Sequence, residues 1–327
     1  ALDRNDATLS VYHDWILAIA KKFEKVTIIC LKKGDYSVPE NVTVLSLGKE
    51  RGASRLQYVW NFYRYVVATR KDYDSVFVHM NQEYILLGGL LWKILGKKIY
   101  MWRNHHAGSI LTDIVAAFCT HVFCTSKFSY TAKYRKTVIM PVGIDTEVFK
   151  KVVGVTRMGR KILFLARIAP VKKPHVLLAA LDILKTKGVH FTADIYGDPL
   201  EKDVVYAESL KKTVKDRGLL NMVTFCGGVP NTDTVHVYNE HDVFVNLSSS
   251  GMYDKTIFEA MSCEIMVIAS NKNLHGLIGE EYIFEEDNAE QLAEKLENLL
   301  ALSVLDKEQR GVELRKVVIE QHSLIGL

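Results

Sequence analysis

Residues 246–270 read NLSSSGMYDKTIFEAMSCEIMVIAS, and this stretch decides the fold class. A β-branched run over 243–247 leads into a small polar turn at 248–251. A short helix is expected over 254–263, and a second apolar run follows it. Strand, serine-glycine turn, helix and strand form a unit of a parallel α/β sheet, and such a turn offers backbone N–H groups to an anion. An ordinary βαβ crossover has the same pattern, so the turn alone leaves both interpretations open.

The rest of the chain repeats this alternation of strands and helices. Short, nearly all-apolar runs are typical of strands buried on both faces of a parallel sheet. In the first half they predict strands at 26–31, 42–47, 75–80, 98–102, 122–125 and 138–141, with helices at 9–22, 54–71, 83–95, 108–118 and 127–135. In the second half, besides the opening stretch, strands are expected at 161–166, 191–196, 223–226 and 282–284, and helices at 174–187, 202–217, 231–239, 288–302 and 306–321.

The alternation pauses at 142–160, where three glycines among charged residues indicate a linker. The fold class is therefore α/β, with two successive Rossmann-like, doubly wound domains at 1–145 and 146–305. The C-terminal helix, 306–327, is a separate segment, and packing back toward the first domain is one arrangement for it. A doubly wound domain begins with a strand, so we expect a short strand to precede residue 1.

Length and composition exclude several classes of protein. A chain of 327 residues is long enough for two cores, yet no apolar run approaches the ~18 residues that span a bilayer. No secretory signal is visible. The five cysteines are an odd number without CxxC spacing, which indicates reduced thiols in a cytoplasmic protein and argues against a disulfide framework or a zinc site.

Charge is distributed unevenly along the chain. Residues 1–150 hold 21 Lys and Arg against 13 Asp and Glu, a balance of +8, and the remainder, 21 against 25, has −4. A basic first half suggests an anionic partner such as a phospholipid surface, a lipid-linked substrate or nucleic acid, although balances of this size are common in soluble proteins. The helix SRLQYVWNFYRYVVATRK, 54–71, mixes cations with aromatic residues. It could lie on an anionic membrane, at the inner membrane surface, or be a core-facing helix with a basic outer face.

Two cations follow the first predicted strand of the second domain. Arg167 and Lys172 lie in FLARIAPVKKP, at the carboxyl end of that strand and before its helix. Arg can hold a diphosphate through two parallel hydrogen bonds, and Lys can hold it as a point charge. The alternative is a solvated Lys-Lys pair beside a surface Arg. The stretch also has no GxGxxG, which argues against a dinucleotide dehydrogenase.

Several short motifs together resemble one family. They are GID at 143–145 followed by Phe149, the Arg-x4-Lys just described, IYGD at 195–198, VTFCGGV at 223–229, FEAMSC at 258–263 and VIAS at 267–270. In this order and at these distances the chain resembles the family-4 retaining glycosyltransferases of the GT-B fold. The resemblance implies two facing Rossmann-like domains with a cleft between them, and it is stronger in the second half than in the first.

The resemblance also implies roles for individual residues. Arg167 and Lys172 would neutralise the diphosphate of a sugar-nucleotide donor, and Glu259 would bind the ribose hydroxyls. The rest of the implied donor-binding set is Gly197, Gly227, Val229, Gly251, Met252, Tyr253, Asp254 and Lys255.

The chain departs from the family's pattern at several positions. The family places a second Glu eight residues before the first, close to the donor sugar, and this chain has Gly251 there. We expect Asp254 to take over part of the sugar contact, the alternative being that it only caps the helix. Lys255 and Glu259, four residues apart, could instead form a surface ion pair. Glu264 stands where the family usually has Gly, and Val142 where it often has Asn.

In the first half, YMWRNHHAGS places two histidines just past the carboxyl end of a strand. The family has a His near here that faces the donor sugar, and His105 matches it better than His106. Imidazole can donate a hydrogen bond or move a proton at neutral pH, which makes His105 a candidate catalytic residue with Arg167, Lys172 and Asp254. Both histidines could also be ordinary loop residues. The first loop, 1–6, lacks the Gly-Gly with which the family approaches the donor phosphates.

Two further patterns are set aside. Asp72-Tyr73-Asp74 matches the DxD of metal-dependent glycosyltransferases, but it precedes its strand and is more typical of a turn. The sequons at Asn41 and Asn246 lie in or beside predicted buried strands, so glycosylation is not expected there.

These observations predict a cytoplasmic, metal-independent hexosyltransferase of polysaccharide biosynthesis. It would move a sugar from a UDP- or GDP-sugar to a glycan or lipid-linked glycan, with no resident cofactor and no nucleic-acid partner. Retention at the anomeric carbon would follow from same-face attack assisted by the leaving phosphate, and domain closure around 142–160 would exclude water. Two alternatives stay open, a catalytically silent sugar-nucleotide-binding protein and a sugar-nucleotide epimerase of the same fold. The base, sugar, acceptor, linkage and oligomeric state are not predicted.

Overall fold

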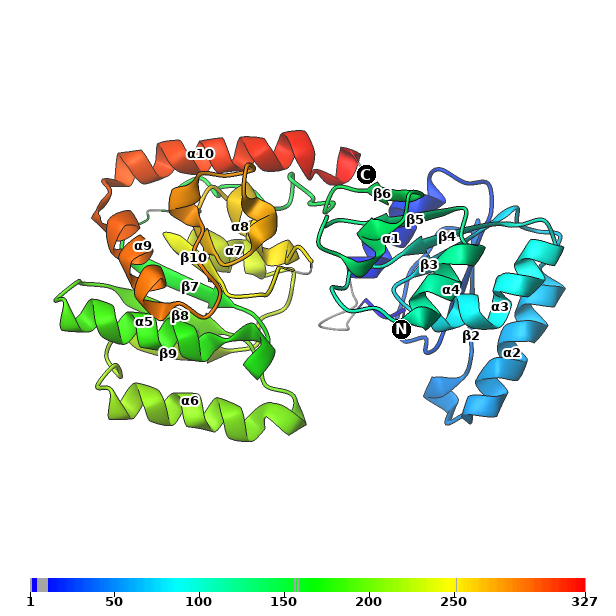
Figure 1. The fold of residues 1–327 in the computed structure, drawn as a ribbon, viewed down its shortest axis with the longest axis horizontal. Helices are drawn as coiled ribbons and strands as arrows, with labels where there is room; N and C mark the ends of the chain where they lie inside the picture. Colours follow the sequence, from blue (N-terminus) through cyan, green and yellow to red (C-terminus); the bar gives the residue numbers. More distant parts are fainter. Residues whose placement is uncertain (1, 5–10, 156, 158, 251, 327) are drawn as a thin grey trace. The chain divides into compact units, whose positions relative to one another are not determined.

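The computed structural model describes residues 2–4, 11–155, 157, 159–250 and 252–326. The chain forms two compact units, labelled along the chain in Figure 1. Unit 1 comprises Ala1–Arg103, Gly108–Phe123 and Lys133–Val138, and unit 2 comprises Asn104–Ala107, Cys124–Ala132 and Ile139–Leu327. The domain limits that we inferred from the sequence stay a prediction.

Unit 1 is built on parallel strands. One sheet has the order β3-β4-β5-β6, and β1 and β2 pair separately in a parallel, two-stranded ladder. The strands are β1 (Val26–Cys30), β2 (Val42–Ser46), β3 (Ser75–His79), β4 (Lys98–Trp102), β5 (His121–Cys124) and β6 (Thr137–Ile139). Each predicted strand of the first half is thereby confirmed to within about two residues, because short apolar runs bounded by polar turns suit strands buried in a parallel sheet.

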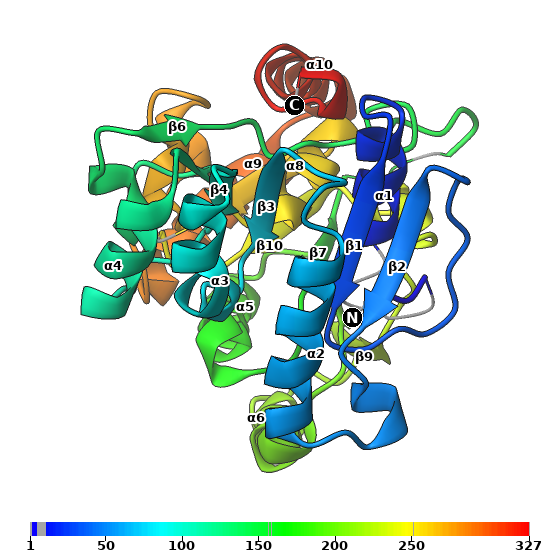
Figure 2. The same cartoon turned by 90° about the vertical axis from the view of Figure 1, so that its right-hand side faces the viewer.

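In the described part of unit 1 the α-helices are α1 (Val11–Ala20), α2 (Arg55–Ala68), α3 (Glu83–Ile94) and α4 (Ile110–Phe118). Ser54 begins α2 with a capping box, in which its hydroxyl accepts from Gln57 N and the Gln57 side chain accepts from Ser54 N. Figure 2 shows α2, α3 and α4 side by side. Their inner faces supply Phe62, Ile85 and Val115 to the core of this unit, each at most 2% exposed.

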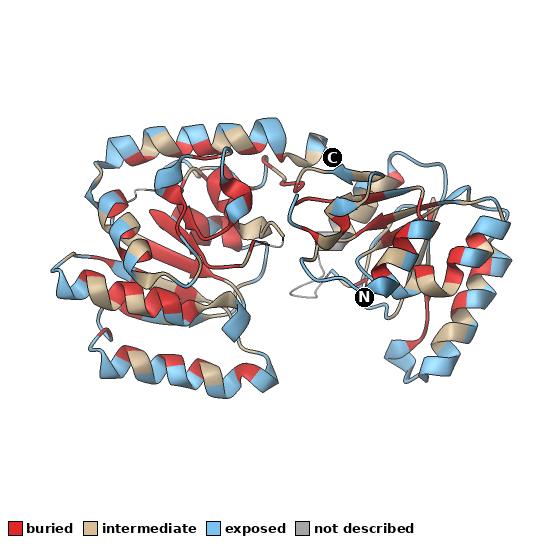
Figure 3. Cartoon of the chain, viewed as in Figure 1, coloured by how far each residue is buried: buried red, intermediate tan, exposed pale blue. Residues whose placement is uncertain are grey.

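Unit 2 contains a five-stranded parallel sheet of order β11-β10-β7-β8-β9. Its strands are β7 (Lys161–Leu165), β8 (Thr192–Tyr196), β9 (Val223–Gly227), β10 (Val243–Asn246) and β11 (Met266–Ala269). All four residues of β10 and of β11 are buried, which Figure 3 shows as red strands, so helices cover both faces of the sheet. The helices of unit 2 are α5 (Pro174–Thr186), α6 (Val204–Asp216), α7 (Thr234–Asn239), α8 (Lys255–Ser262), α9 (Ala289–Ala301) and α10 (Val304–Gln321).

The end of α10 is tied to the GID segment. The carbonyl of His322 accepts hydrogen bonds from Gly143 N and Ile144 N at 3.1 and 2.8 Å, and Leu324 N donates to Ile144 O at 2.7 Å. The His322 ring packs against Phe258 of α8, with ring centroids 4.2 Å apart. Burial there lowers the pKa of His322 to about 4.

The turn after α8 explains one departure from the family pattern. Glu264 has a φ of 59°, in the left-handed region where glycine is favoured. Its carbonyl accepts from Arg157 Nη1 at 2.6 Å, and its carboxylate lies 3.9 Å from Arg315 Nε. These contacts hold a non-glycine residue in a conformation that costs roughly 1–2 kcal/mol.

Two elements differ from the sequence prediction. A helix was expected at 127–135, but only a short 3-10 helix, η2 (Tyr130–Lys133), forms there. A strand was expected at 282–284, but η6 (Glu280–Tyr282) is a 3-10 helix, and Ile283 makes only an isolated bridge to Ala269. At 282–284 the apolar side chains are at most 6% exposed, buried by tertiary packing that local periodicity does not encode, whereas Phe128 in the first segment is 43% exposed.

Candidate functional site

The carboxyl ends of the strands of unit 2 bring the predicted residues to one edge of the sheet. Because the strands are parallel, the segments that follow β7, β8, β9 and β10 all leave at that edge. These ends pack closely. A Cβ on Gly197 would lie 1.9 Å from the carbonyl oxygen of Ala166, and Gly197 N donates to Gly227 O at 2.8 Å. The predicted residues Gly197 and Gly227 thus allow three strand ends to converge.

A charged cluster joins two of the predicted residues at this edge. Lys172, in η3 (Pro170–Lys172), places its ammonium 2.6 Å from Asp254 Oδ2 and 3.0 Å from Ser248 Oγ. The Ser248 hydroxyl donates to the same carboxylate oxygen at 2.8 Å, and the Thr256 hydroxyl donates to Asp254 Oδ1 at 3.0 Å. Lys172 and Asp254 are 82 positions apart in the sequence. Because Lys172 is ion-paired with Asp254, the alternative interpretation of Lys172 as a solvated surface lysine is wrong.

Asp254 occupies the N-cap position of α8 but does not cap the helix with its side chain. Burial disfavours its charge, but Lys172 and Ser248 outweigh burial and hold the pKa of this carboxyl well below its usual range. No side chain accepts from the first backbone N–H groups of the helix in the described structure. These donors and the positive end of the helix dipole are what an anion needs.

Arg167 follows β7 at the same edge. Its backbone lies so close to Gly197 that a Cβ on this glycine would be 3.4 Å from Arg167 Cα. The side chain is exposed, and within the described ranges no hydrogen bond or ion pair engages its guanidinium. An unpaired guanidinium thus follows the same strand as the paired Lys172.

Glu259 lies one helical turn into α8, with its side chain only 4% exposed. It accepts a hydrogen bond from the Tyr238 hydroxyl at 3.0 Å, and the Lys255 ammonium lies 3.8 Å from its other oxygen. The predicted pair with Lys255 exists, but it is not a surface pair. Burial raises the pKa of Glu259 and is the largest influence on it. The role of Glu259 in binding ribose stays a prediction.

Hydrogen bonds from the loop after β11 stabilise the bend between β10 and α8, and the sequence analysis missed the residues that make them. Asn273 Nδ2 donates to Ser250 O at 2.6 Å, and Asn271 Nδ2 donates to Met252 O at 2.9 Å. The Tyr253 hydroxyl donates to Asn273 O at 2.9 Å. The predicted residues Met252 and Tyr253 therefore hold the shape of the bend through these bonds. Two asparagines in a short loop after a buried strand are a weak signal, since the same residues suit any turn.

Glu286 is a further residue that was missed. Its carboxylate accepts from both the backbone N–H and the hydroxyl of Ser250, each at 3.2 Å, and lies 3.4 Å from the Lys173 ammonium. Although burial opposes its charge, the Ser250 N–H and Lys173 lower the pKa of Glu286. A carboxylate thus lies beside position 250, next in the chain to Gly251, which falls outside the described residues.

The remaining predicted residues make fewer contacts that bear on their proposed roles. Val229 is half-buried against the core of unit 2. His105 and His106 stack on each other with ring centroids 4.7 Å apart. Ala107 N and Ala107 O lie 3.0 and 3.1 Å from His105 Nδ1, and these two contacts fit different tautomers of the ring. Nothing in the described structure hydrogen-bonds His105 to Lys172 or Asp254, and its catalytic role stays a prediction.

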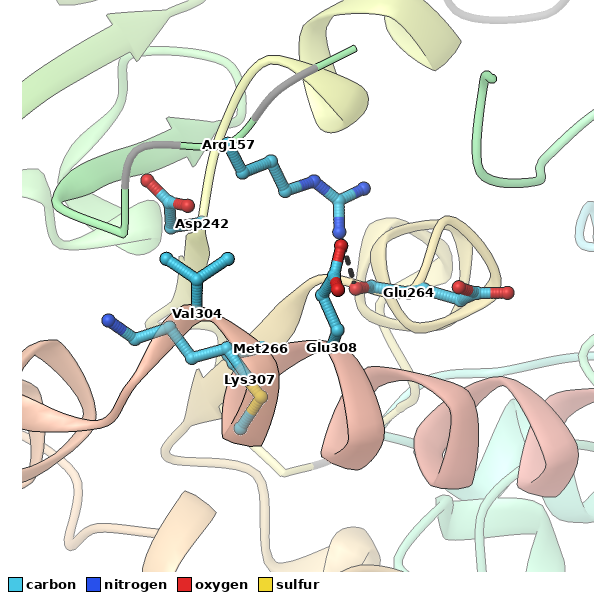
Figure 4. Close-up of a pocket in the computed structure, with 7 residues that line it drawn as sticks. All are labelled: Arg157, Asp242, Glu264, Met266, Val304, Lys307 and Glu308. Carbon is cyan, nitrogen blue, oxygen red and sulfur yellow. Dashed lines mark hydrogen bonds between the residues drawn. The ribbon is translucent and has the colours of Figure 1, made fainter. Parts of the chain in front are cut away.

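A pocket lined by charged residues lies at the opposite edge of the sheet of unit 2 (Figure 4). Asp242, just before β10, accepts from Gly159 N and Lys161 N, both at 2.8 Å. Arg157 donates to Glu264 O, and Lys307 donates to Gly159 O at 2.7 Å. These charges are used to hold backbone at the amino ends of the strands, so the cluster is structural.

The two patterns set aside from the sequence have structural roles. Asp72 forms an ion pair with Lys25 at 3.2 Å and precedes β3, at the amino end of that strand. Asn246 is buried and accepts from Ser248 N at 3.0 Å. Across the described ranges, no three His, Cys, Asp or Glu side chains gather so that they could hold a metal ion.

Comparison with known proteins agrees with this geometry. The model of the family described as glycosyl transferases group 1 matches residues 145–320. A D-inositol 3-phosphate glycosyltransferase of Frankia alni is 28% identical over 153 residues, which are 43% of this chain and 38% of that protein. Spore coat protein SA of Bacillus subtilis is 33% identical over 158 residues, 44% of this chain and 41% of that protein. The chain thus spans about two fifths of the length of these curated relatives.

Solved structures resemble nearly the whole chain. Anabaena Alr3699/HepE in complex with UDP and glucose superposes with a TM-score of 0.78 and 16% identity, covering 99% of this chain and 95% of that one. Sucrose-phosphate synthase from Thermosynechococcus elongatus has a TM-score of 0.77 and 16% identity, covering 98% and 91%. At this identity the likeness concerns the fold, and it confirms the predicted α/β fold of GT-B type.

Proposed function

The chain belongs to the glycosyl transferases group 1 family, and on that premise we propose that it moves a sugar from a nucleoside-diphosphate sugar to an acceptor hydroxyl with retention of configuration. The acceptor would be a glycan or a lipid-linked glycan. The observation that carries this proposal is the Lys172–Asp254–Ser248 cluster beside the first turn of α8. A cation, a hydroxyl and helix N–H groups at the carboxyl edge of a parallel sheet suit a diphosphate.

The cluster suggests how the donor diphosphate would be held. The ammonium of Lys172 has three protons, and hydrogen bonds to Asp254 and Ser248 use two of them. The third N–H stays available to a phosphate oxygen, and the hydrogen bonds to Asp254 and Ser248 fix its direction. Arg167 adds a guanidinium whose donors form fork-shaped pairs with phosphate oxygens. Asp254 would act mainly by orienting Lys172, because three hydrogen bonds already fill most of its acceptor sites. Its contact with the sugar remains part of this proposal.

The proposed reaction exchanges one bond for another at the anomeric carbon. The bond from that carbon to the diphosphate oxygen breaks, and negative charge grows on the diphosphate. The acceptor oxygen bonds to the same face, and its proton passes to the departing phosphate oxygen. The transition state resembles an oxocarbenium ion, so groups that stabilise the leaving diphosphate act more strongly there than on the bound donor. His105 would contact the donor sugar through its imidazole ring.

The remaining finer points belong to the same proposal. The donor would be a UDP- or GDP-sugar, and the UDP in the Anabaena HepE complex supports the first of these. Two cations and a helix N-terminus supply the charge that a metal would otherwise supply, so we expect no resident metal. The reaction would take place in the cytoplasm as a step of polysaccharide biosynthesis. No helix of the described structure has the length and apolar character needed to cross a membrane.

A silent sugar-nucleotide-binding protein is the second candidate. Two observations favour it, since position 251 lacks the family's carboxylate and the charge of Lys172 is already balanced by Asp254. An epimerase is less well supported, because Asp254 is ion-paired and Glu259 is buried and hydrogen-bonded. Neither carboxyl is placed as a free acid or base.

A panel of UDP-, GDP- and ADP-sugars tests the proposal. Thermal stabilisation of the full chain identifies the donor, and release of free nucleoside diphosphate in the presence of candidate acceptors measures transfer. We expect stabilisation by one class of donor, and release of diphosphate that depends on Lys172. Stabilisation without any release would support the silent protein, and the absence of stabilisation by every donor would refute both.

A further inference from the structure

The outer surface of α2 carries an apolar stripe that the core does not use. Leu56, Trp60 and Val67 are 83%, 71% and 45% exposed, and their spacing of four and seven residues places them along one side of the helix. The core side of α2 is different, with Phe62 and Val66 at most 2% exposed. The helix therefore has two apolar faces, and only one of them is packed.

The two neighbouring helices also carry exposed apolar residues. On α3, Leu90 and Ile94 are 63% and 74% exposed, and on α4, Ile110 and Ile114 are 77% and 43% exposed. The three helices are in contact and lie side by side in Figure 2. The Tyr63 hydroxyl of α2 donates to the carbonyl of Leu87 in α3 at 2.7 Å. A Cβ on Gly89 of α3 would lie 2.9 Å from the Phe118 ring of α4.

These residues form one surface, which we call the outer apolar face: Leu56, Trp60, Leu90, Ile94, Ile110 and Ile114. Single exposed apolar residues are ordinary, but here six lie on three neighbouring helices of one unit. Patches of this kind mark sites of interaction with a protein or a membrane.

Positive charge surrounds the part of this face on α2. Residues 54–71 contain Arg55, Arg64, Arg70 and Lys71 and no Asp or Glu. All four cations are exposed, and in the described ranges none is paired with a carboxylate. Arg64 and Arg70 instead lie along their own helix, donating to Tyr65 Oη and Val67 O. A stripe containing Trp and Leu, bordered by unpaired cations, is typical of a helix that lies in a membrane interface.

A second copy of the chain fits this surface less well. Contact between two identical faces would bring the four cations of one α2 toward those of the other without acidic partners in the same segment. Anionic headgroups neutralise these charges, while acyl chains cover the apolar side chains. We propose that the outer apolar face docks unit 1 on a membrane surface containing anionic lipid. This proposal does not rest on the enzymatic activity proposed above.

Vesicle binding by the full chain tests this assignment. We expect co-sedimentation with vesicles of phosphatidylcholine mixed with phosphatidylglycerol, little with phosphatidylcholine alone, and weaker binding at high salt because screening shortens electrostatic range. Trp60 provides an internal probe, since its emission should shift to shorter wavelength on anionic vesicles and Trp60→Phe should abolish that shift. Trp92 and Trp102 are at most 5% exposed and should not respond.

Two variants and a matched control separate the apolar and the electrostatic contributions to vesicle binding. Leu56→Ser with Trp60→Ser should weaken binding by tenfold or more. Arg64→Gln with Lys71→Gln should weaken binding by about 25-fold, since each cation near an anionic surface contributes about a factor of five. The control is Val205→Ser with Leu305→Ser, which alters side chains that are 84% and 73% exposed in unit 2 and should leave binding unchanged.

The outcomes decide the proposal once unchanged melting temperatures show that the variants fold. No binding to anionic vesicles at low salt would overturn it, as would equal losses in the unit 2 control. Sedimentation velocity provides a further arm. A concentration-dependent dimer that dissociates in the Leu56→Ser, Trp60→Ser variant would assign the face to a second copy instead.

Discussion

Replacement of Lys172 by Ala is the most direct test of the candidate site. The change removes an ammonium that lies 2.6 Å from Asp254 and 3.0 Å from Ser248, with the lysine and aspartate side chains 29% and 15% exposed. Removing one partner of a fully buried pair costs about 3–5 kcal/mol, and partial exposure of Lys172 lowers our expectation to roughly 2–3 kcal/mol in the free energy of unfolding. Asp254 keeps the Ser248 and Thr256 hydroxyls as donors.

The loss of ligand binding should be similar in free energy to this loss of stability. A hydrogen bond to a charged group contributes about 1.5–3 kcal/mol, so we expect the Kd for the nucleoside diphosphate to rise roughly 10- to 150-fold. The unpaired carboxylate of Asp254 then also repels the diphosphate. Turnover should fall by about 100- to 1000-fold, because charge on the leaving group is greatest in the transition state.

Calorimetry with UDP and GDP and a diphosphate-release assay measure these effects. The Lys172→Ala, Asp254→Ala double variant should bind the diphosphate better than Lys172→Ala alone, since the uncompensated carboxylate is gone. The matched control is Lys161→Ala, because Lys161 lies 3.1 Å from Asp194 with exposures of 35% and 15%, at the other edge of the same sheet. Wild-type turnover in Lys172→Ala, or an equal loss in Lys161→Ala, would refute this reasoning.

Three further predictions concern the surroundings of the site. Gly197→Ala should lower the free energy of unfolding by about 3 kcal/mol or more, or prevent folding, because its Cβ would lie 1.9 Å from Ala166 O. The control is Gly188→Ala, which is also at a positive φ but has open space around it. In urea unfolding it should lower the free energy of unfolding by only about 1 kcal/mol. His322 has a folded pKa of about 4, below the usual 6.5, so the unfolded chain binds its proton first. Stability should therefore fall as pH decreases from 6.5 toward 4, by up to about 1.4 kcal/mol per pH unit from this residue, and His322→Gln should remove that part of the slope. Glu286→Ala removes the acceptor of the Ser250 N–H and should raise the donor KM several-fold with little change in kcat; a larger loss in kcat than in KM would instead indicate contact with the reacting sugar.

The sequence by itself determined the elements and the edge at which the site would lie. Runs such as 161–165 and 243–246 are apolar nearly throughout and short, which suits only strands covered on both faces. Parallel strands place the turns that follow them at one edge, so Arg167, Lys172 and the bend at 248–251 could be assigned to a common edge from the sequence alone.

Local pattern failed where long-range packing decides. A helix was expected at 127–135 but only η2 forms, and 282–284 resembles a strand but makes a single bridge. Short segments have little intrinsic conformational preference of their own, so contacts with distant residues select their conformation.

The tertiary structure alone decided which charges meet. Lys172 and Asp254 are 82 positions apart, and Glu286 and Ser250 are 36 positions apart. Over such separations, spacing in the sequence does not predict which side chains are close in space. From the sequence, Asp254 was expected to contact the sugar or to cap the helix, and only the tertiary structure pairs it with Lys172. The outer apolar face has the same origin, since periodicity marks an amphipathic helix but only packing shows which of its apolar sides is left exposed.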